Sequence, residues 1–213
     1  LTGSLLRSRF NFFFDSQLAA FSETPNLIIA AYSCFVLGNV FMCQAVITLV
    51  RLVDTKNPSW AIWGGVLVIF GLFARTYHGG IDHLAFQLVA VQDLETATEI
   101  IGKSYGAFHI MRYFNFAILF GWIVLAIGVY RSRIIGWIRS IALGSMALLP
   151  LGTLKGTKIE SIICTAALCI ALIPLGIEVL RKCSRPNRRT LTWMTLFFIL
   201  IIIIVVLETF GYL

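Results

Sequence analysis

Charged residues are scarce in this chain. Only 13% of its 213 residues are Asp, Glu, Lys or Arg, whereas 59% are hydrophobic. A soluble domain usually has about 25% charged residues, so this composition is typical of a membrane protein. The net charge of +7 is spread over short loops between apolar runs and forms no basic face with interleaved aromatic residues. This distribution argues against nucleic acid as a partner.

Several motifs that carry well-known chemistry are also missing. The sequence has no phosphate-binding GxxxxGK(S/T) loop, no dinucleotide-binding GxGxxG turn and no HExxH zinc motif. Its five cysteines form no CxxC pair, so they give no sign of a zinc ribbon or a disulfide framework. Residues 191–212 contain no lysine, which removes a retinal Schiff base from consideration.

Long apolar runs dominate what is present. A membrane-spanning helix needs about 20 mainly apolar residues, and six runs meet this requirement: residues 26–50, 59–78, 105–130, 134–153, 159–180 and 190–212. We therefore predict an all-α fold, a polytopic membrane bundle of six transmembrane helices within residues 26–213. Residues 1–25 form a separate N-terminal segment, which either lies in the membrane interface or packs on the bundle as an aromatic linker.

The loops between these runs predict an orientation, because lysine and arginine accumulate on the cytoplasmic side of a membrane. Alternate loops carry most of these residues: Arg51, Lys56, Arg131, Arg133, Arg181, Lys182, Arg185, Arg188 and Arg189. Both ends of the chain are therefore expected outside the cell.

Residues 82–101 are expected to form an additional helix on the outer face. One unbroken helix over residues 59–101 would be about 64 Å long, roughly twice the thickness of the hydrocarbon layer. We therefore predict a bend at Gly79 and Gly80, followed by a helix that Asp82 caps and that carries its acidic residues outward.

Ionisable residues cluster on either side of this predicted bend. Arg75, His78 and Asp82 are spaced three and four residues apart, so they share one face of a continuous helix. On the next predicted span, Tyr105, His109 and Arg112 form a second polar stripe. Ionisable residues within a membrane mark functional sites. The pattern predicts an outward-facing ligand-binding pocket formed by nine residues: Arg75, Tyr77, His78, Asp82, His83, Tyr105, His109, Arg112 and Glu208.

Three functions are compatible with this pocket. The arginines favour binding or transport of an anionic or amphipathic ligand, such as an anionic lipid or a lipopeptide. A membrane-embedded hydrolase or lipid-modifying enzyme is the first alternative, with a divalent metal held by His78, Asp82, His83 and His109. A haem between His83 and His109 is a further possibility for the histidines.

The third function is that of a structural subunit, with partner subunits in a membrane complex. In that case Arg75 or Arg112 pairs with Asp82 or Glu208, and the histidines donate to backbone carbonyls, because buried charges in a membrane need partners.

A family resemblance rests on three short motifs. The Arg-His-Asp stretch is followed by Gly106-Ala107-Phe108-His109, and Tyr130-Arg131-Ser132-Arg133 then precedes Ile135-Gly136. Over residues 60–150 this order resembles an uncharacterised bacterial family of small multi-pass membrane proteins. The resemblance implies a helical bundle in the bacterial inner (plasma) membrane and no particular activity.

Overall fold

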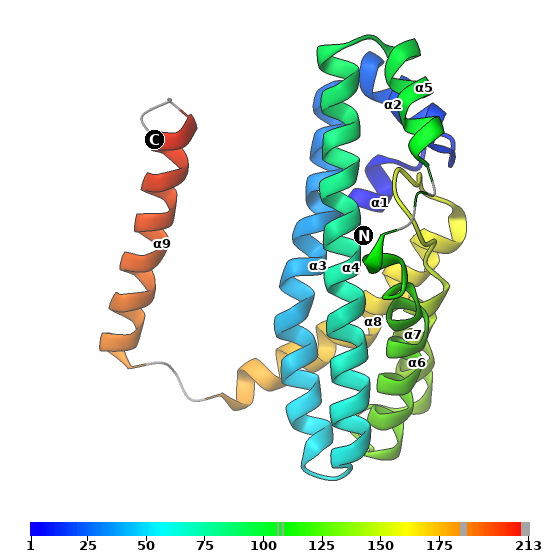
Figure 1. The fold of residues 1–213 in the computed structure, drawn as a ribbon. Coiled ribbons are helices and arrows are strands. Elements are labelled where there is room, and N and C mark those ends of the chain that lie inside the picture. The colour runs from blue at the N-terminus through cyan, green and yellow to red at the C-terminus, as the bar shows by residue number, and fades with distance from the viewer. Residues whose placement is uncertain (106, 108, 184–186, 210–213) are drawn as a thin grey trace. The chain divides into compact units, whose positions relative to one another are not determined.

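The fold is all-helical. The computed structural model describes residues 1–105, 107, 109–183 and 187–209. In these residues the helices are α1 (Thr2–Leu6), α2 (Phe14–Glu23), α3 (Pro25–Asp54), α4 (Pro58–Val91), α5 (Leu94–Ser104), η1 (Ile110–Arg112), α6 (Asn115–Arg131), α7 (Trp137–Gly144), η2 (Ser145–Leu148), α8 (Ile159–Lys182) and α9 (Arg188–Thr209) (Figure 1). The chain divides into two compact units, Leu1–Gly176 and Ile177–Leu213, and residues 1–25 belong to the first.

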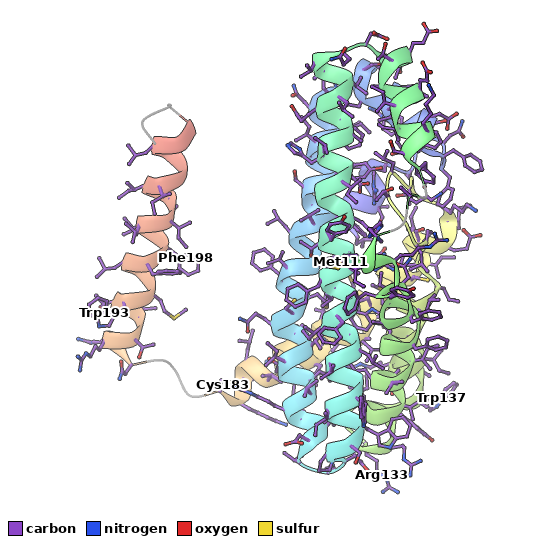
Figure 2. All side chains as sticks on the ribbon, viewed as in Figure 1. Met111, Arg133, Trp137, Cys183, Trp193 and Phe198 are labelled. Atoms are coloured by element: carbon purple, nitrogen blue, oxygen red, sulfur yellow. The ribbon has the colours of Figure 1, made fainter. Side chains whose placement is uncertain are left out.

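Four helical stretches are long and apolar enough to cross a membrane, which indicates a membrane protein. They are Pro25–Asp54, Pro58–Val91, Ile110–Arg131 and Ile159–Lys182. The predicted span at residues 134–153 instead contains α7 and η2, of 8 and 4 residues, which fall short of the about 20 residues that a span needs. The exposed Trp137 opens α7 and points away from it (Figure 2).

The last predicted span coincides with α9, a helix of 22 residues. Its large apolar side chains are exposed along the described part of the helix, Trp193 and Phe198 among them (Figure 2). A helix that is apolar on every side is typical of a lipid environment. That α9 crosses the membrane remains a prediction.

The predicted bend at Gly79 and Gly80 is wrong, because α4 continues through both glycines to Val91. With 34 residues, α4 is about 51 Å long at about 1.5 Å per residue, longer than the hydrocarbon layer of about 30 Å. A Cβ on Gly79 would clash with Cγ2 of Val36 in α3. The glycine therefore lets two helices approach closely instead of ending one of them.

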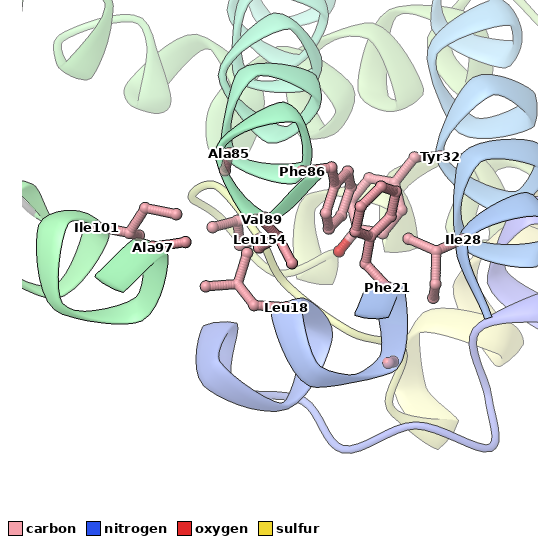
Figure 3. Close-up of a cluster of buried hydrophobic side chains, with 11 residues drawn as sticks. Leu18, Phe21, Ile28, Tyr32, Ala85, Phe86, Val89, Ala97, Ile101 and Leu154 are labelled. Atoms are coloured by element: carbon pink, nitrogen blue, oxygen red, sulfur yellow. The ribbon is translucent and has the colours of Figure 1, made fainter. Parts of the chain in front are cut away.

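A hydrophobic cluster explains how α4 extends beyond that thickness. Buried residues of α2, α3, α4 and α5 pack together where α3 begins and α4 ends (Figures 1 and 3). The ring of Phe86 stacks on Phe21 with centroids 5.0 Å apart and meets the edge of Tyr32 at 4.9 Å. The C-terminal end of α4 is thus stabilised by protein contacts, so the helix can extend beyond the hydrocarbon thickness without a bend.

Close contact between α4 and α6 forms the centre of the bundle. Cβ atoms built on Gly64 and Gly71 would lie 2.8 and 3.0 Å from the Cα atoms of Leu125 and Ile118. On the α6 side of the same contact, a Cβ on Gly121 would lie 2.8 Å from the backbone of α4. Small residues at regular spacing let transmembrane helices pack backbone to backbone, so this contact fixes the register of α4 against α6.

Two of the basic loops lie at the same end of the first unit. Lys56 Nζ, after α3, donates to the Ser132 carbonyl oxygen after α6 at 3.0 Å, and the Arg131 guanidinium lies 5.6 Å from the ring centroid of Trp60. These contacts agree with the predicted alternation of the loops (Figure 1). The contacts show that both loops lie at one end of the first unit, whichever side of the membrane that end faces.

Candidate functional site

Three ionisable side chains of α4 lie on its buried side. Arg75, His78 and Asp82 have exposed fractions of 6%, 7% and 7%. Because α4 is continuous here, the spacing of three and four residues places them on one face, as the sequence predicted. All three line a small cavity of ≈ 40 Å³.

Arg75 and Asp82 do not pair with each other. Both bind the backbone of residues 149–158, the non-helical segment between η2 and α8. Arg75 donates to the carbonyl oxygens of Leu149 and Pro150 at 3.4 and 3.3 Å, and the Leu154 N–H donates to Asp82 Oδ1 at 2.5 Å. The ion pairs among the described side chains are Lys103–Glu99 and Lys182–Glu178. Asp82 therefore pairs with neither Arg75 nor Arg112, and the alternative partner, Glu208, has its side chain outside the described residues.

Other elements hold the same 149–158 segment. Arg7 Nη1 donates to the Lys155 carbonyl oxygen at 2.9 Å, and Tyr105 Oη donates to that of Thr153 at 3.1 Å. The Gly156 N–H donates to the Phe12 carbonyl oxygen at 2.9 Å. Non-helical backbone within a membrane protein is tolerated where protein groups satisfy it. These contacts explain how the segment is held without its own helix.

A second, larger cavity of ≈ 530 Å³ lies beside this segment. Its polar end includes His109, whose ring centroid is 5.1 Å from that of Tyr77 and 6.2 Å from that of His78. Two buried atoms there, His109 Nδ1 and Asn115 Oδ1, have no hydrogen-bond partner in the described part of the chain. Arg112 lines the same cavity and is exposed. Unpartnered polar atoms next to a cation define a place where a polar ligand group can bind.

The rest of the larger cavity is mostly apolar. Its apolar lining comes mainly from α4 and α5: Ile81, Leu84, Ala85, Leu88, Ile100 and Ile101. Backbone and side chains of Gly152, Thr153 and Leu154 complete the wall from the 149–158 segment. None of the described lining residues is acidic, so the fixed charge of the cavity is positive.

The predicted site residues are only partly brought together. The larger cavity is lined by five of them, Tyr77, His78, Tyr105, His109 and Arg112, whereas Arg75 and Asp82 line only the small one. His83 is exposed and lines neither cavity. The side chain of Glu208 lies outside the described residues.

The second polar stripe is wrong as a helical feature. Tyr105 ends α5, His109 has extended backbone and Arg112 belongs to the 3₁₀ helix η1. A regular helix was predicted for these three residues. They instead have different backbone conformations, and their side chains all line the larger cavity. Sequence reasoning missed Asn115, Arg7 and the 149–158 segment. Pro150, Gly152 and Gly156 were the available signal that the fourth apolar run stops being helical.

The four proposed metal ligands are not assembled. Among the residues that the structure describes, no group of three or more His, Cys, Asp or Glu side chains is placed to hold a metal ion. His78 and His109 are neighbours, but Asp82 Oδ1 binds the Leu154 N–H and His83 is exposed. His109 lines the larger cavity and His83 does not, so the two histidines proposed to hold a haem share no cavity.

The helix α5, which forms one wall of the larger cavity, has an acidic N-cap. Asp93 accepts hydrogen bonds from the backbone N–H and the hydroxyl of Thr96, both at 2.8 Å. The Thr96 backbone bond, followed by the hydroxyl bond, lowers the pKa of the Asp93 carboxyl below its usual value. The cap is therefore complete at neutral pH and is lost as the pH falls through this lowered pKa.

We expect amide hydrogen exchange in the first turn of α5 to accelerate, relative to intrinsic rates, when the pH falls below about 4. Asp93→Ala should show the faster exchange already at neutral pH, as measured by mass spectrometry of α5 peptides. Asp54→Ala, at the far end of α3, serves as the control. Exchange in α5 that is the same in Asp93→Ala and the unmodified protein would contradict the cap.

Comparison of the chain with protein-family models, curated proteins and solved structures gives no match.

Proposed function

We propose that the larger cavity binds an amphipathic ligand with an anionic head group. The supporting observation is the division of its lining into a polar end and an apolar wall from α4 and α5. At the polar end Arg112 can donate to an anion, and the unpartnered Asn115 Oδ1 can accept from a hydroxyl of the same head group. Arginine is well suited to phosphate and carboxylate groups, because its planar guanidinium donates several parallel hydrogen bonds. The volume of ≈ 530 Å³ falls within the range of about 300–1,000 Å³ found for small-molecule sites.

The place of the cavity along α4 also favours a membrane amphiphile. His78 follows Pro58, the first residue of α4, by 20 positions, which is about 30 Å along the helix axis and equals the thickness of the hydrocarbon layer. In our proposal the polar end therefore lies at the border of the hydrocarbon. A head group would bind there, and its chain would lie along the apolar wall.

We further propose that this border faces the outside of a bacterial-type plasma membrane, in a multi-pass protein. The basic loops with Arg51, Lys56, Arg131 and Arg133 lie at the opposite end of the first unit (Figure 1). Such residues accumulate on the cytoplasmic side. Binding is the step that transport and enzymatic modification of such a ligand share, and the proposal is limited to it.

Arg112→Gln tests this proposal, with dodecyl phosphate as the probe. We expect the variant, in phosphatidylcholine nanodiscs, to bind dodecyl phosphate about tenfold more weakly, because a hydrogen bond to a charged group contributes roughly 1.5–3 kcal/mol. Binding of neutral dodecyl maltoside should be unchanged. Equilibrium binding of radiolabelled probe, corrected for partition into empty nanodiscs, gives both values.

Arg51→Gln is the matched control, since Arg51 is also an exposed arginine but lies at the opposite end of the first unit. It should bind both probes like the unmodified protein. Equal affinity of Arg112→Gln and Arg51→Gln for dodecyl phosphate would sink the proposal. Ile81→Trp, which fills the apolar wall, should weaken binding of both probes.

A further inference from the structure

The small cavity, which shares His78 and Gly152 with the larger one, has a mainly polar and charged lining. Its polar side chains come from four parts of the chain: Ser4 and Arg7, the α4 residues Arg75, His78 and Asp82, Lys155 and Thr157 of the 149–158 segment, and Ser161 in the first turn of α8. Thr157 and Ser161 have exposed fractions of 8% and 5%. The volume of ≈ 40 Å³ excludes a lipid head group and leaves room for a single small ion or a few water molecules.

Three buried polar atoms of this lining have no hydrogen-bond partner among the described residues. They are Arg75 Nε, Thr157 Oγ1 and Ser161 Oγ. Arg75 Nε can only donate, and both hydroxyls can donate. Leaving such groups unpaired in a buried site is costly, so the cavity is built to receive an acceptor.

The buried charges also do not balance. Arg7 and Arg75 are both buried, and Asp82 is the buried carboxylate that lines the cavity with them. Lys155, half-buried, adds a further positive charge, with its Nζ 5.2 and 5.4 Å from the ring centroids of Phe12 and Tyr105. An excess of positive charge away from water needs a counter-ion.

The helix α8 contributes to the same excess. It begins at Ile159 and runs for 24 residues, and the partial positive charge of its N-terminus is close to Ser161, which lines the cavity. Its exposed Glu160 lies outside the cavity lining. Helix N-termini favour anions, because their first N–H groups have no partner within the helix.

We propose that this cavity binds a small monovalent anion of halide size, with chloride as the physiological representative. Arg75 Nε, the Thr157 hydroxyl and the Ser161 hydroxyl donate to it, and the ion balances the positive charge of the buried arginines. Because Arg75 also binds Leu149 and Pro150, the ion joins the 149–158 segment to α4 and α8. This site is distinct from the proposed ligand cavity, although His78 and Gly152 line both.

Halide-dependent stability tests the site in the whole protein in nanodiscs. We expect the melting temperature to rise saturably when sodium chloride replaces sodium gluconate at constant ionic strength, since gluconate is too large for the cavity. Bromide should act like chloride. Ser161→Ala and Thr157→Val should each raise the half-saturating chloride concentration by about tenfold, because each removes a donor to the ion.

Thr165→Val is the matched control. Thr165 is a buried hydroxyl residue one turn further along α8, but its Oγ1 already donates to the Ser161 carbonyl oxygen at 2.8 Å. Its chloride dependence should equal that of the unmodified protein. The same melting temperature in chloride and gluconate, or a chloride dependence that Ser161→Ala and Thr157→Val leave unchanged, would show a cavity that holds water only.

Crystals soaked in bromide give a second measurement that needs no variant. An anomalous peak among Arg75, Thr157 and Ser161 is expected, and a cavity without such a peak would overturn the proposal. The dodecyl phosphate assay reports on the larger cavity alone. Loss of one site therefore leaves the other intact, and the two proposals can fail separately.

Discussion

Replacing Arg75 by methionine is expected to destabilise the protein by about 2–5 kcal/mol, because it leaves the carbonyl oxygens of Leu149 and Pro150 without their donor. Methionine keeps much of the length of the side chain, so little of the loss should come from a cavity. Unfolding in mixed micelles with increasing dodecyl sulfate gives the free energy. Faster hydrogen exchange at residues 149–158 would locate the damage.

Two further variants separate this role from an ion pair. Asp82→Asn keeps an oxygen that accepts from the Leu154 N–H, so it should cost much less than Asp82→Ala, which leaves that N–H unpaired. If Arg75 were stabilised mainly by the charge of Asp82, Asp82→Asn would be as damaging as Arg75→Met. Arg112→Met should leave stability unchanged, since Arg112 is exposed and donates no side-chain hydrogen bond to the described residues.

Gly64→Ala is expected to destabilise the protein by about 1–3 kcal/mol, which is typical of overpacking at a close contact. The added Cβ would lie 2.8 Å from the Cα of Leu125, and backbone atoms cannot rotate away as a side chain can. α4 and α6 would have to separate along their length. Thermal unfolding in detergent, together with the fraction of protein recovered as a single species by size-exclusion chromatography, measures the effect.

The matched control is Gly80→Ala in the same helix. No atom lies within 4 Å of a Cβ on Gly80, and alanine is the better helix former by up to about 1 kcal/mol. Gly80→Ala should therefore be neutral or stabilising. A loss of stability in Gly80→Ala equal to that in Gly64→Ala would mean that the helix and not the α4–α6 contact is sensitive to the substitution.

Both features of the fold that differ from the prediction, the straight α4 and the irregular backbone at His109, depend on contacts between segments far apart in the chain. The bend in α4 was predicted because one unbroken helix over residues 59–101 would be about twice as long as the hydrocarbon layer is thick. In the structure Phe86 and neighbouring residues of α4 pack on α2 and α3 there. The stripe of Tyr105, His109 and Arg112 was predicted from an apolar run, but the run only becomes an α-helix at Asn115.

Length and apolarity are properties of a contiguous run of residues. The sequence by itself therefore determined the all-helical class, α3 and the apolar part of α4. Residue spacing alone also determined that Arg75, His78 and Asp82 share one face of α4. Only the tertiary structure decided what those side chains bind. The partners of Arg75 and Asp82 lie in the 149–158 segment, 72 to 75 residues further along the chain. A hydrogen bond between a side chain and distant backbone depends on how the helices pack, so it cannot be predicted from helical periodicity.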